Sequence, residues 1–376
     1  MMRFFLALCL ATSFLSATVL LRGQSEGMHF RVEVVASGLK SIPWGMVFVD
    51  ESTLLLTQIQ GDILLLDVRS GRVRPVFGMP VQPVYGGQGG LLDVVKSPQF
   101  KEDNTLFFTY VKSVSFQGAT TLASATLENH MLTNWKDLLI TQSTSNTSQH
   151  FGSRIAFDEN GLLYFSIGDR GMRAEAQDLR SHKGTIVRLH QDGSVPSDNP
   201  FVDHPYALKE IYSYGHRNPQ GLAFDPLKHR LYASEHGPRG GDEINLIEAG
   251  KNYGWPSISY GKEYWAPISI GEGTHKEGME QPLHHYTPSI APGSLLVYTG
   301  GAFPHWQGNL FLGALKLQHL NRIVLDENDG VVKEERLLES LGLRIRQVLQ
   351  DENGWLYLST DSGEILRIVP ESAALP

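Results

Sequence analysis

The stretch RIAFDENGLLYFSIGDRG, residues 154–171, contains two short apolar runs separated by a polar turn. The runs RIAF and LLYFSI are rich in Ile, Leu, Phe and Tyr and have the length of β-strands. Asp, Glu, Asn and Gly occupy the segment between them, and these residues favour tight turns. The stretch therefore predicts two antiparallel strands joined by a turn.

The same pattern of run, turn and run recurs along the chain. The six copies lie at residues 44–67, 91–111, 154–171, 221–237, 301–326 and 346–369. Such repetition predicts an all-β fold, a six-bladed β-propeller with four-stranded antiparallel blades. A pair of β-sandwiches is the competing fold, but it does not require the same pattern six times. Helical periodicity is sustained nowhere after residue 25, in agreement with an all-β fold. Because six blades use the whole of residues 26–376, these residues are predicted to form a single domain.

Long insertions separate some of the copies, among them residues 172–210 and 252–298. Binding residues are often carried on long surface loops that a rigid scaffold positions. Both segments are therefore predicted to lie as loops on one face of the propeller and to build a site there.

The N-terminal segment MMRFFLALCLATSFLSATVLLRGQS, residues 1–25, differs from the rest of the chain. Arg3 precedes an apolar run from Phe4 to Leu21. This predicts a secretory signal peptide, although the run is also long enough for an uncleaved membrane anchor. The protein is therefore predicted to be exported, to the periplasm or beyond. The single cysteine, Cys9, lies in this run, so disulfides and thiol catalysis are excluded for residues 26–376.

The chain has a formal net charge of −8, which disfavours a general nucleic-acid-binding protein. Within this acidic chain, Arg217, Lys316, Arg344 and Arg346 occur at expected turns or strand ends. Equivalent blade ends of a propeller converge around one axis. The cations therefore predict a site for a ligand with several carboxylates or phosphates. The alternative is that each is a surface cation with a local acidic partner.

His150 is the best candidate for a general base, because imidazole titrates near neutral pH. Asp169, at the far end of the same two-strand stretch, is suited to orient the ring through its other nitrogen. A lone histidine is also commonly a surface residue or a satisfied core residue, so this signal alone is weak.

The loop SEHGPRGGDEINLIEAGKNYGWP, residues 234–256, is acidic and rich in glycine. Such loops can supply Ca²⁺ with carboxylate and carbonyl oxygens. They are also ordinary turns, and the residue pattern leaves both interpretations open.

Together these motifs resemble the soluble quinoprotein glucose dehydrogenases, and more closely their aldose sugar dehydrogenase branch. The matching segments, in order, are GGQGGLLDVV, HFGSRIAFDENGLLYFSIGDRG, YGHRNPQGLAFD, the 234–256 loop, GNLFLGALK and RIRQVLQDENGWLYLSTD. The resemblance implies a propeller that binds pyrroloquinoline quinone (PQQ) and Ca²⁺. It also implies oxidation of aldose sugars at the anomeric carbon to lactones, with electrons passed to an external acceptor such as a quinone, a dye or a cytochrome.

The resemblance further implies a role for each candidate residue. His150 would remove the proton of the anomeric hydroxyl while hydride passes to the quinone, and Asp169 would hold His150. The residues that would bind PQQ are Gln88, Arg217, Asn218, Lys316, Arg344 and Arg346. The Ca²⁺ that polarises the quinone would bind the backbone carbonyls of Gly237 and Pro238, and the residues that match a second, structural Ca²⁺ site are Glu243 and Tyr253.

Two departures from the resemblance concern the substrate. Gln149 stands where glucose-specialised relatives carry an acidic residue, and residues 252–298 do not resemble their sugar-contact and dimer loops. A broad aldose specificity is therefore predicted, and the oligomeric state, monomer or homodimer, stays open.

Two other function classes compete with a sugar dehydrogenase. A calcium-dependent lactonase needs a metal held by carboxylates in the central channel and has no use for four cations. A non-catalytic propeller that binds a glycan or a protein partner is expected to have lost some of the candidate residues. The joint presence of His150, Arg217, Asn218 and the other three cations favours the dehydrogenase.

Overall fold

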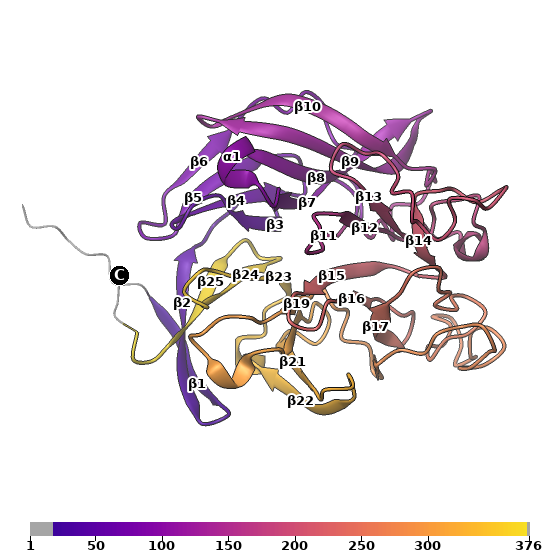
Figure 1. Ribbon diagram of the computed structural model, residues 1–376. Helices are drawn as coiled ribbons and strands as arrows, with labels where there is room; N and C mark the ends of the chain where they lie inside the picture. Colours follow the sequence, from indigo (N-terminus) through magenta and orange to yellow (C-terminus); the bar gives the residue numbers. More distant parts are fainter. Residues whose placement is uncertain (1–17, 374–376) are drawn as a thin grey trace, which may run out of the picture.

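The computed structural model describes residues 18–373, which form six antiparallel β-sheets (Figure 1). Five sheets have four strands and one has five. The first blade contains β3 (Pro43–Phe48), β4 (Thr53–Gln58), β5 (Ile63–Asp67) and β6 (Val73–Val76). The second contains β7 (Leu91–Lys96), β8 (Thr105–Val114), β9 (Gln117–Glu128) and β10 (Met131–Ile140). The third contains β11 (Ile155–Phe157), β12 (Leu163–Ile167), β13 (Thr185–Leu189) and β14 (Ile211–Tyr214).

The remaining blades follow the same plan. The fourth contains β15 (Pro219–Asp225), β16 (Arg230–Glu235), β17 (Asp242–Ile247) and β18 (His284–Tyr286). The fifth contains β19 (Leu296–Val297), β20 (Leu310–Gly313), β21 (Leu320–Leu325) and β22 (Val331–Leu337). The sixth contains β23 (Ile345–Gln350), β24 (Leu356–Thr360) and β25 (Ile365–Pro370), joined by β2 (Met28–Ala36) and β1 (Val19–Ser25) from the start of the described chain.

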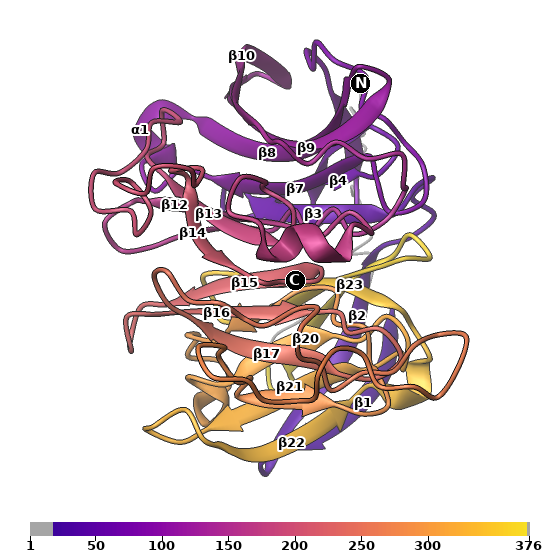
Figure 2. The same cartoon turned by 90° about the vertical axis from the view of Figure 1, so that its right-hand side faces the viewer.

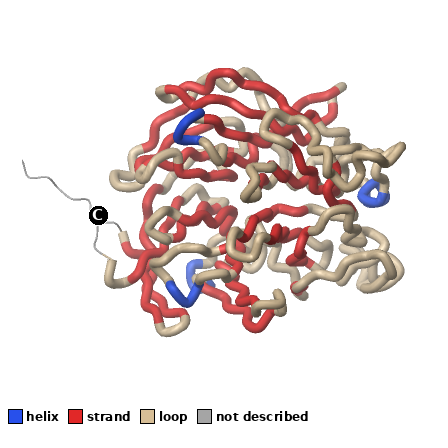
Figure 3. The backbone as a smooth tube through the Cα atoms, in the orientation of Figure 1, coloured by secondary structure: helices blue, strands red, loops and turns tan. Residues whose placement is uncertain are grey.

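Helical structure within residues 18–373 is confined to short connections, as Figure 3 shows. They are α1 (Phe100–Asp103) and the 3₁₀ turns η1 (Arg173–Gln177), η2 (Pro304–Trp306) and η3 (Glu339–Leu341). None of these described helices has the length and apolar character needed to cross a membrane.

The inner strands of the six blades form a ring. β3 contacts β7, β7 contacts β11, β11 contacts β15, β15 contacts β19, β20 contacts β23, and β23 contacts β3. Each of the six repeated sequence stretches falls in a different sheet. The prediction of a six-bladed propeller with four-stranded antiparallel blades is therefore confirmed, with a fifth strand added to the sixth blade.

The sixth blade joins both ends of the described chain. β2 pairs with β25 as the fourth strand, and β1 pairs with β2 as the fifth. Because β1 spans Val19–Ser25, the propeller sheet begins before residue 26, where the sequence analysis places the domain boundary. The rest of the predicted leader, residues 1–17 with Cys9, lies outside the described residues, and its role in export stays a prediction.

The two long segments are only partly loops, contrary to the sequence prediction. Residues 172–210 contain β13, and residues 252–298 contain β18 and β19. They supply the third strand of the third blade, the fourth strand of the fourth blade and the first strand of the fifth blade. Their irregular parts lie on the right-hand side of Figure 1, the side that faces the viewer in Figure 2.

The hydrophobic core lies between neighbouring blades. In β4, Leu55 packs in a cluster with Val94 and Phe108 of the second blade, whereas Leu54 and Leu56 pack with Tyr357 of the sixth. Successive side chains of a strand point to opposite faces of its sheet. Because both faces of each blade are covered by another blade, the strands are continuous apolar runs, which explains the six repeated stretches.

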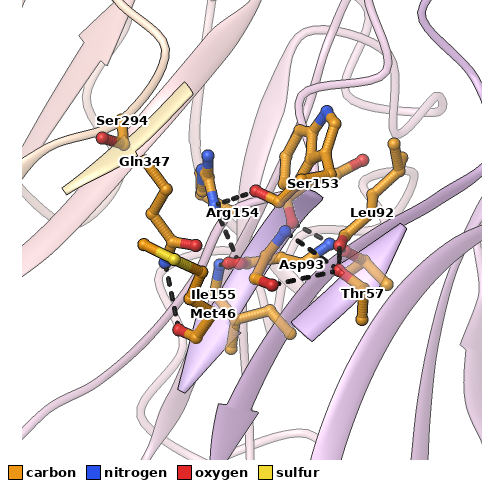
Figure 4. Close-up of polar contacts among 12 residues, drawn as sticks. Met46, Thr57, Leu92, Asp93, Ser153, Arg154, Ile155, Ser294 and Gln347 are labelled. Carbon is orange, nitrogen blue, oxygen red and sulfur yellow. Dashed lines mark hydrogen bonds and ion pairs between the residues drawn. The ribbon is translucent and has the colours of Figure 1, made fainter. Parts of the chain in front are cut away.

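The propeller axis is closed by the side chain of Arg154, which is buried (Figure 4). Its guanidinium donates hydrogen bonds to Asp93 Oδ1 at 2.8 Å and to the carbonyls of Gln220, Gly293 and Arg346 at 2.9, 2.8 and 3.3 Å. It also lies 4.0 Å from the ring centroid of Trp44. The side chain of Arg154, from the third blade, thus contacts residues in or next to the inner strands of the other five blades.

Candidate active site

A cavity of ≈ 550 Å³ lies at the end of the inner strands that bears the two long segments. Seven of the predicted site residues line it: Gln88, His150, Asp169, Arg217, Gly237, Pro238 and Lys316. They come from the connections that precede β7, β11 and β15 and from the turns after β12, β16 and β20. The propeller fold therefore brings together residues that are far apart in the sequence, as predicted.

His150 and Asp169 form a buried pair at this cavity. His150 Nδ1 lies 2.6 Å from Asp169 Oδ1, and Asp169 Oδ1 also accepts the backbone N–H of Gly171 at 2.7 Å. Gln88 accepts the backbone N–H of His150 at 2.7 Å, so it supports His150 as well as lining the cavity. With Nδ1 engaged by the carboxylate, Nε2 is the ring nitrogen available to a molecule in the cavity.

The electrostatic surroundings keep this pair in the form that a base requires. Burial, together with the charges of Arg217 and Arg170, lowers the pKa of His150 below its usual value, although Asp169 opposes the change. Burial favours the neutral form of Asp169, but the hydrogen bonds from His150 and Gly171 outweigh it and hold the pKa of Asp169 below its usual value. At neutral pH the pair is thus a neutral imidazole beside a carboxylate.

A tight approach of two backbone segments makes this geometry possible. His150 has a φ of 57°, in the left-handed region. A Cβ placed on Gly168, just before Asp169, would lie 2.2 Å from the carbonyl oxygen of His150. Glycine is therefore required at residue 168 for Asp169 to reach the imidazole ring.

Arg217 and Asn218 lie in the turn that precedes β15. Arg217 Nη1 donates to the carbonyls of His236 and Gly237 at 2.9 and 2.8 Å, and Nη2 lies 3.3 Å from the hydroxyl of Tyr264. Within residues 18–373, the buried atoms Arg217 Nε and Asn218 Nδ2 have no hydrogen-bond partner. No carboxylate of the described chain lies within ion-pair distance of the Arg217 guanidinium, so its charge is available to an anion.

The other three predicted cations differ from one another. Lys316 lines the cavity and forms no ion pair with any described residue. Arg344 and Arg346 do not line it, and both bind Asp361, at 2.8 and 2.9 Å. For these two arginines the local acidic partner, the alternative considered from the sequence, is present. Arg344 still lies close to the cavity, because it donates to the carbonyl of Leu315, next to Lys316, and the charge of Arg346 acts on His236, which lines the cavity.

The four predicted metal ligands fall at two places. Gly237 and Pro238 line the cavity, and the Gly237 carbonyl accepts the hydrogen bond from Arg217. Glu243 and Tyr253 line an adjoining small cavity of ≈ 20 Å³, which Glu235, Gly237 and Arg217 also line. Among residues 18–373 no three His, Cys, Asp or Glu side chains form a metal-binding cluster. The predicted sites would instead use backbone carbonyls together with one or two carboxylates.

Several residues at the cavity escaped the sequence analysis. Arg173 forms a two-pronged ion pair with Glu263 at 2.6 and 3.0 Å, which ties the two long segments together. His236 lines the cavity, and burial lowers its pKa to about 3, so it is neutral. Trp255 donates its indole N–H to Asp169 Oδ2 at 2.8 Å. Of these, His236 and Trp255 lie in the 234–256 loop, one of the segments that carried the family resemblance, whereas Arg173 lies outside those segments.

The described residues thus form a six-bladed β-propeller with a polar cavity at one end of its inner strands. The sequence profile described as Glucose / Sorbosone dehydrogenase matches residues 40–367. The chain therefore belongs to the glucose/sorbosone dehydrogenase family, a family of oxidoreductases, and the predicted resemblance is confirmed.

Three comparisons illustrate this membership. The aldose sugar dehydrogenase YliI of Escherichia coli is 38% identical over 350 residues, which cover 91% of this chain and 93% of that protein. A crystal structure of the soluble aldose sugar dehydrogenase of Escherichia coli in the apo-form has a TM-score of 0.86, with 36% identity over 91% of this chain and 100% of that one. A structure of the PQQ-bound aldose sugar dehydrogenase of Streptomyces coelicolor has a TM-score of 0.75, with 26% identity over 90% and 98% of the two chains.

Proposed function

We propose that this protein oxidises aldose sugars at the anomeric carbon to lactones, with PQQ as its redox cofactor and an external molecule as electron acceptor. One observation carries the proposal. A neutral histidine paired with an aspartate shares a cavity of ≈ 550 Å³ with Arg217 and Lys316, two cations that have no carboxylate partner in the described chain. That combination suits a polyanionic cofactor beside a substrate that loses a proton.

The residues present fit PQQ, which carries three carboxylates. Arg217 lines the cavity and its Nε is a buried donor without a partner, and such a group costs free energy until a ligand accepts its hydrogen bond. Asn218, whose Nδ2 also lacks a partner among the described residues, is fully buried next to Arg217 in the chain and does not line the cavity. The ammonium group of Lys316, which also lines the cavity, would contact PQQ as a further cation. Arg344 and Arg346 would act from a greater distance, through their positive potential. When bound, PQQ supplies the ortho-quinone that accepts two electrons.

The residues also fit Ca²⁺ at the two predicted places. At the cavity, backbone carbonyls such as that of Pro238 are oxygen ligands of the kind that Ca²⁺ prefers, and the Gly237 carbonyl would exchange its hydrogen bond from Arg217 for the ion. At the small cavity, burial and the neighbouring Glu235 raise the pKa of Glu243 to about 8. Two buried carboxylates that repel each other are stabilised by a cation, so Glu235, Glu243 and Tyr253 would hold the second ion.

The protein's own contribution to catalysis is proton transfer and orientation. His150 Nε2 would accept the proton of the anomeric hydroxyl, and its lowered pKa keeps it unprotonated at neutral pH. Asp169 would stabilise the imidazolium that forms and hold the ring by Nδ1. Arg173 and Tyr264 would border the substrate, since both line the cavity from the long segments.

Reconstitution tests the proposal. The purified protein would be titrated with PQQ and Ca²⁺, followed by dye reduction with a panel of aldoses, and with the His150→Ala variant as the control for reaction at this site. We expect saturable activity that needs both additions. A protein that fails to bind PQQ would contradict the cofactor assignment, and tight binding without turnover on any aldose would contradict the substrate assignment.

We also propose that the N-terminal segment directs export, so that oxidation takes place in the periplasm or outside the cell. The support is the apolar run that begins at Phe4. Cell fractionation with N-terminal sequencing of the mature protein would test this, and recovery of the uncut protein from the cytoplasm would contradict it.

A further inference from the structure

Trp255 lies behind the candidate active site and contacts three of its parts. It is buried, with 5% of its surface exposed, and it does not line the ≈ 550 Å³ cavity. The guanidinium carbons of Arg173 and Arg217 each lie 5.4 Å from its ring centroid, a distance at which cations are attracted to aromatic rings. The indole ring therefore packs against two cations of the cavity.

The backbone of Trp255 is held as firmly as its ring. Its N–H donates to the carbonyl of Gly215 at 2.9 Å, and its carbonyl accepts a hydrogen bond from the Gln177 amide at 2.8 Å. Gly215 has a φ of 78°, and a Cβ there would lie 2.2 Å from the Asn252 side chain, so the two segments approach closely only because this residue is glycine. The position of the indole is thus set by η1 and by the turn that carries Arg217.

The indole N–H acts on the carboxylate that holds His150. It donates to Asp169 Oδ2 at 2.8 Å, whereas His150 and Gly171 use Oδ1. With a donor on each oxygen, the carboxylate cannot rotate without breaking a hydrogen bond. The same donor spreads the negative charge of Asp169, which weakens its effect on the imidazole ring.

We propose that Trp255 is a positioning residue for the His150–Asp169 pair, which fixes the orientation of Asp169 and limits the proton affinity of His150. The inference rests on the proposed function for its catalytic consequence, although its effect on the His150 pKa does not depend on PQQ. The other charged or titratable groups that face His150 are Arg217, Arg170 and His236.

The test is Trp255→Phe, which keeps an aromatic ring beside both arginines and removes the N–H donor together with part of the buried ring volume. Trp306→Phe is the matched control, because Trp306 is also buried and donates its N–H, at 3.1 Å, to Ser25 in the N-terminal hairpin. Titration of His150 by NMR in the apo-protein should show a higher His150 pKa in Trp255→Phe and no change in Trp306→Phe. After reconstitution, kcat should fall about tenfold in Trp255→Phe alone, with PQQ affinity nearly retained.

An unchanged His150 titration together with unchanged kcat in Trp255→Phe would overturn the proposal. An equal loss of kcat in both variants would also overturn it, because that loss would reflect stability alone. If Trp255→Phe does not fold, benzothienylalanine at residue 255 replaces the N–H by sulfur at the same ring size, and the same two readouts apply. If the wild-type protein does not bind PQQ, the proposed function fails, but the NMR comparison still decides the role of Trp255.

Discussion

Polar side chains at the two ends of the propeller's inner strands differ in whether they find hydrogen-bond partners within their own turns. At the end opposite the candidate active site, a cavity of ≈ 1050 Å³ lies among the turns that follow β3, β7 and β23. Asp50 and Asp351, which line it, accept backbone N–H groups of their own turns, from Ser52 at 2.8 Å and from Trp355 at 2.8 Å. This cavity is the larger of the two, but its turn carboxylates are satisfied locally.

At the candidate active site, the polar side chains do not find their hydrogen-bond partners within their own turns. His150, before β11, pairs with Asp169, after the neighbouring strand β12. Arg217 Nε and Asn218 Nδ2 have no hydrogen-bond partner among residues 18–373. A buried donor without a partner costs about 1–3 kcal/mol, so a protein retains it only where a ligand satisfies it or the cost is offset elsewhere. Among the described residues, an unpartnered buried donor therefore lies at the smaller cavity, on Arg217, and none lies on a residue that lines the larger one.

His150→Ala should have the largest effect on activity. We expect turnover to fall about 10²–10⁴-fold, because the proton acceptor at the cavity is removed. PQQ affinity should stay close to the wild-type value, as measured by titration of the apo-protein. Wild-type turnover in this variant would remove His150 as the base.

Arg217→Gln should have the next largest effect, on cofactor binding. The loss of a charged, partly unsatisfied donor is expected to weaken PQQ binding about 10–100-fold. Arg180→Gln is the control, since Arg180 is an exposed arginine paired with Asp178. Equal PQQ affinity in both variants would show that the cavity does not bind the cofactor through Arg217.

The double variant Arg344→Gln and Arg346→Gln should weaken PQQ binding by a smaller factor, about fivefold. Asp361 already neutralises part of their charge, and neither residue lines the cavity. Asp361→Asn removes the negative charge that pairs with both arginines, so it should strengthen PQQ binding, measured in the same titration. Unchanged affinity in the double variant would place the pair outside the cofactor site.

Asp351→Ala, at the opposite end, should have the smallest functional effect. The loss of its turn hydrogen bond should lower the free energy of unfolding by about 1 kcal/mol, measured by urea denaturation. PQQ affinity and turnover should not change. A loss of PQQ binding here would contradict the functional difference between the two ends.

Much of the fold follows from local sequence patterns. The apolar runs and the Asp, Asn and Gly turns predict hairpins because their hydrogen bonds join residues a few positions apart, as in the Asp158 turn, where Asn160 and Leu162 donate to its carboxylate. The strands inside residues 172–210 and 252–298 were missed because β13 and β18 are short and lie between long polar connections.

The candidate site was predictable to a lesser extent. His150, Asp169, Arg217 and Lys316 were found from their residue types at strand ends together with the family resemblance, and the structure places all four at one cavity. The sequence could not show that Asp361 pairs with both remaining arginines, because that contact depends on the bulged start of β23 beside the last hairpin.

The sequence by itself determined the six blades, the acidic net charge and the set of residues capable of binding an anion and accepting a proton. Only the tertiary structure decided which of these groups are left without hydrogen-bond partners. It also brought Trp255 to Asp169, 86 residues away in the chain, and Arg173 to Glu263, 90 residues away. The physical reason is the range of the interactions. Turns and strands depend on neighbours in sequence, whereas burial and pairing depend on how separate blades pack around the axis.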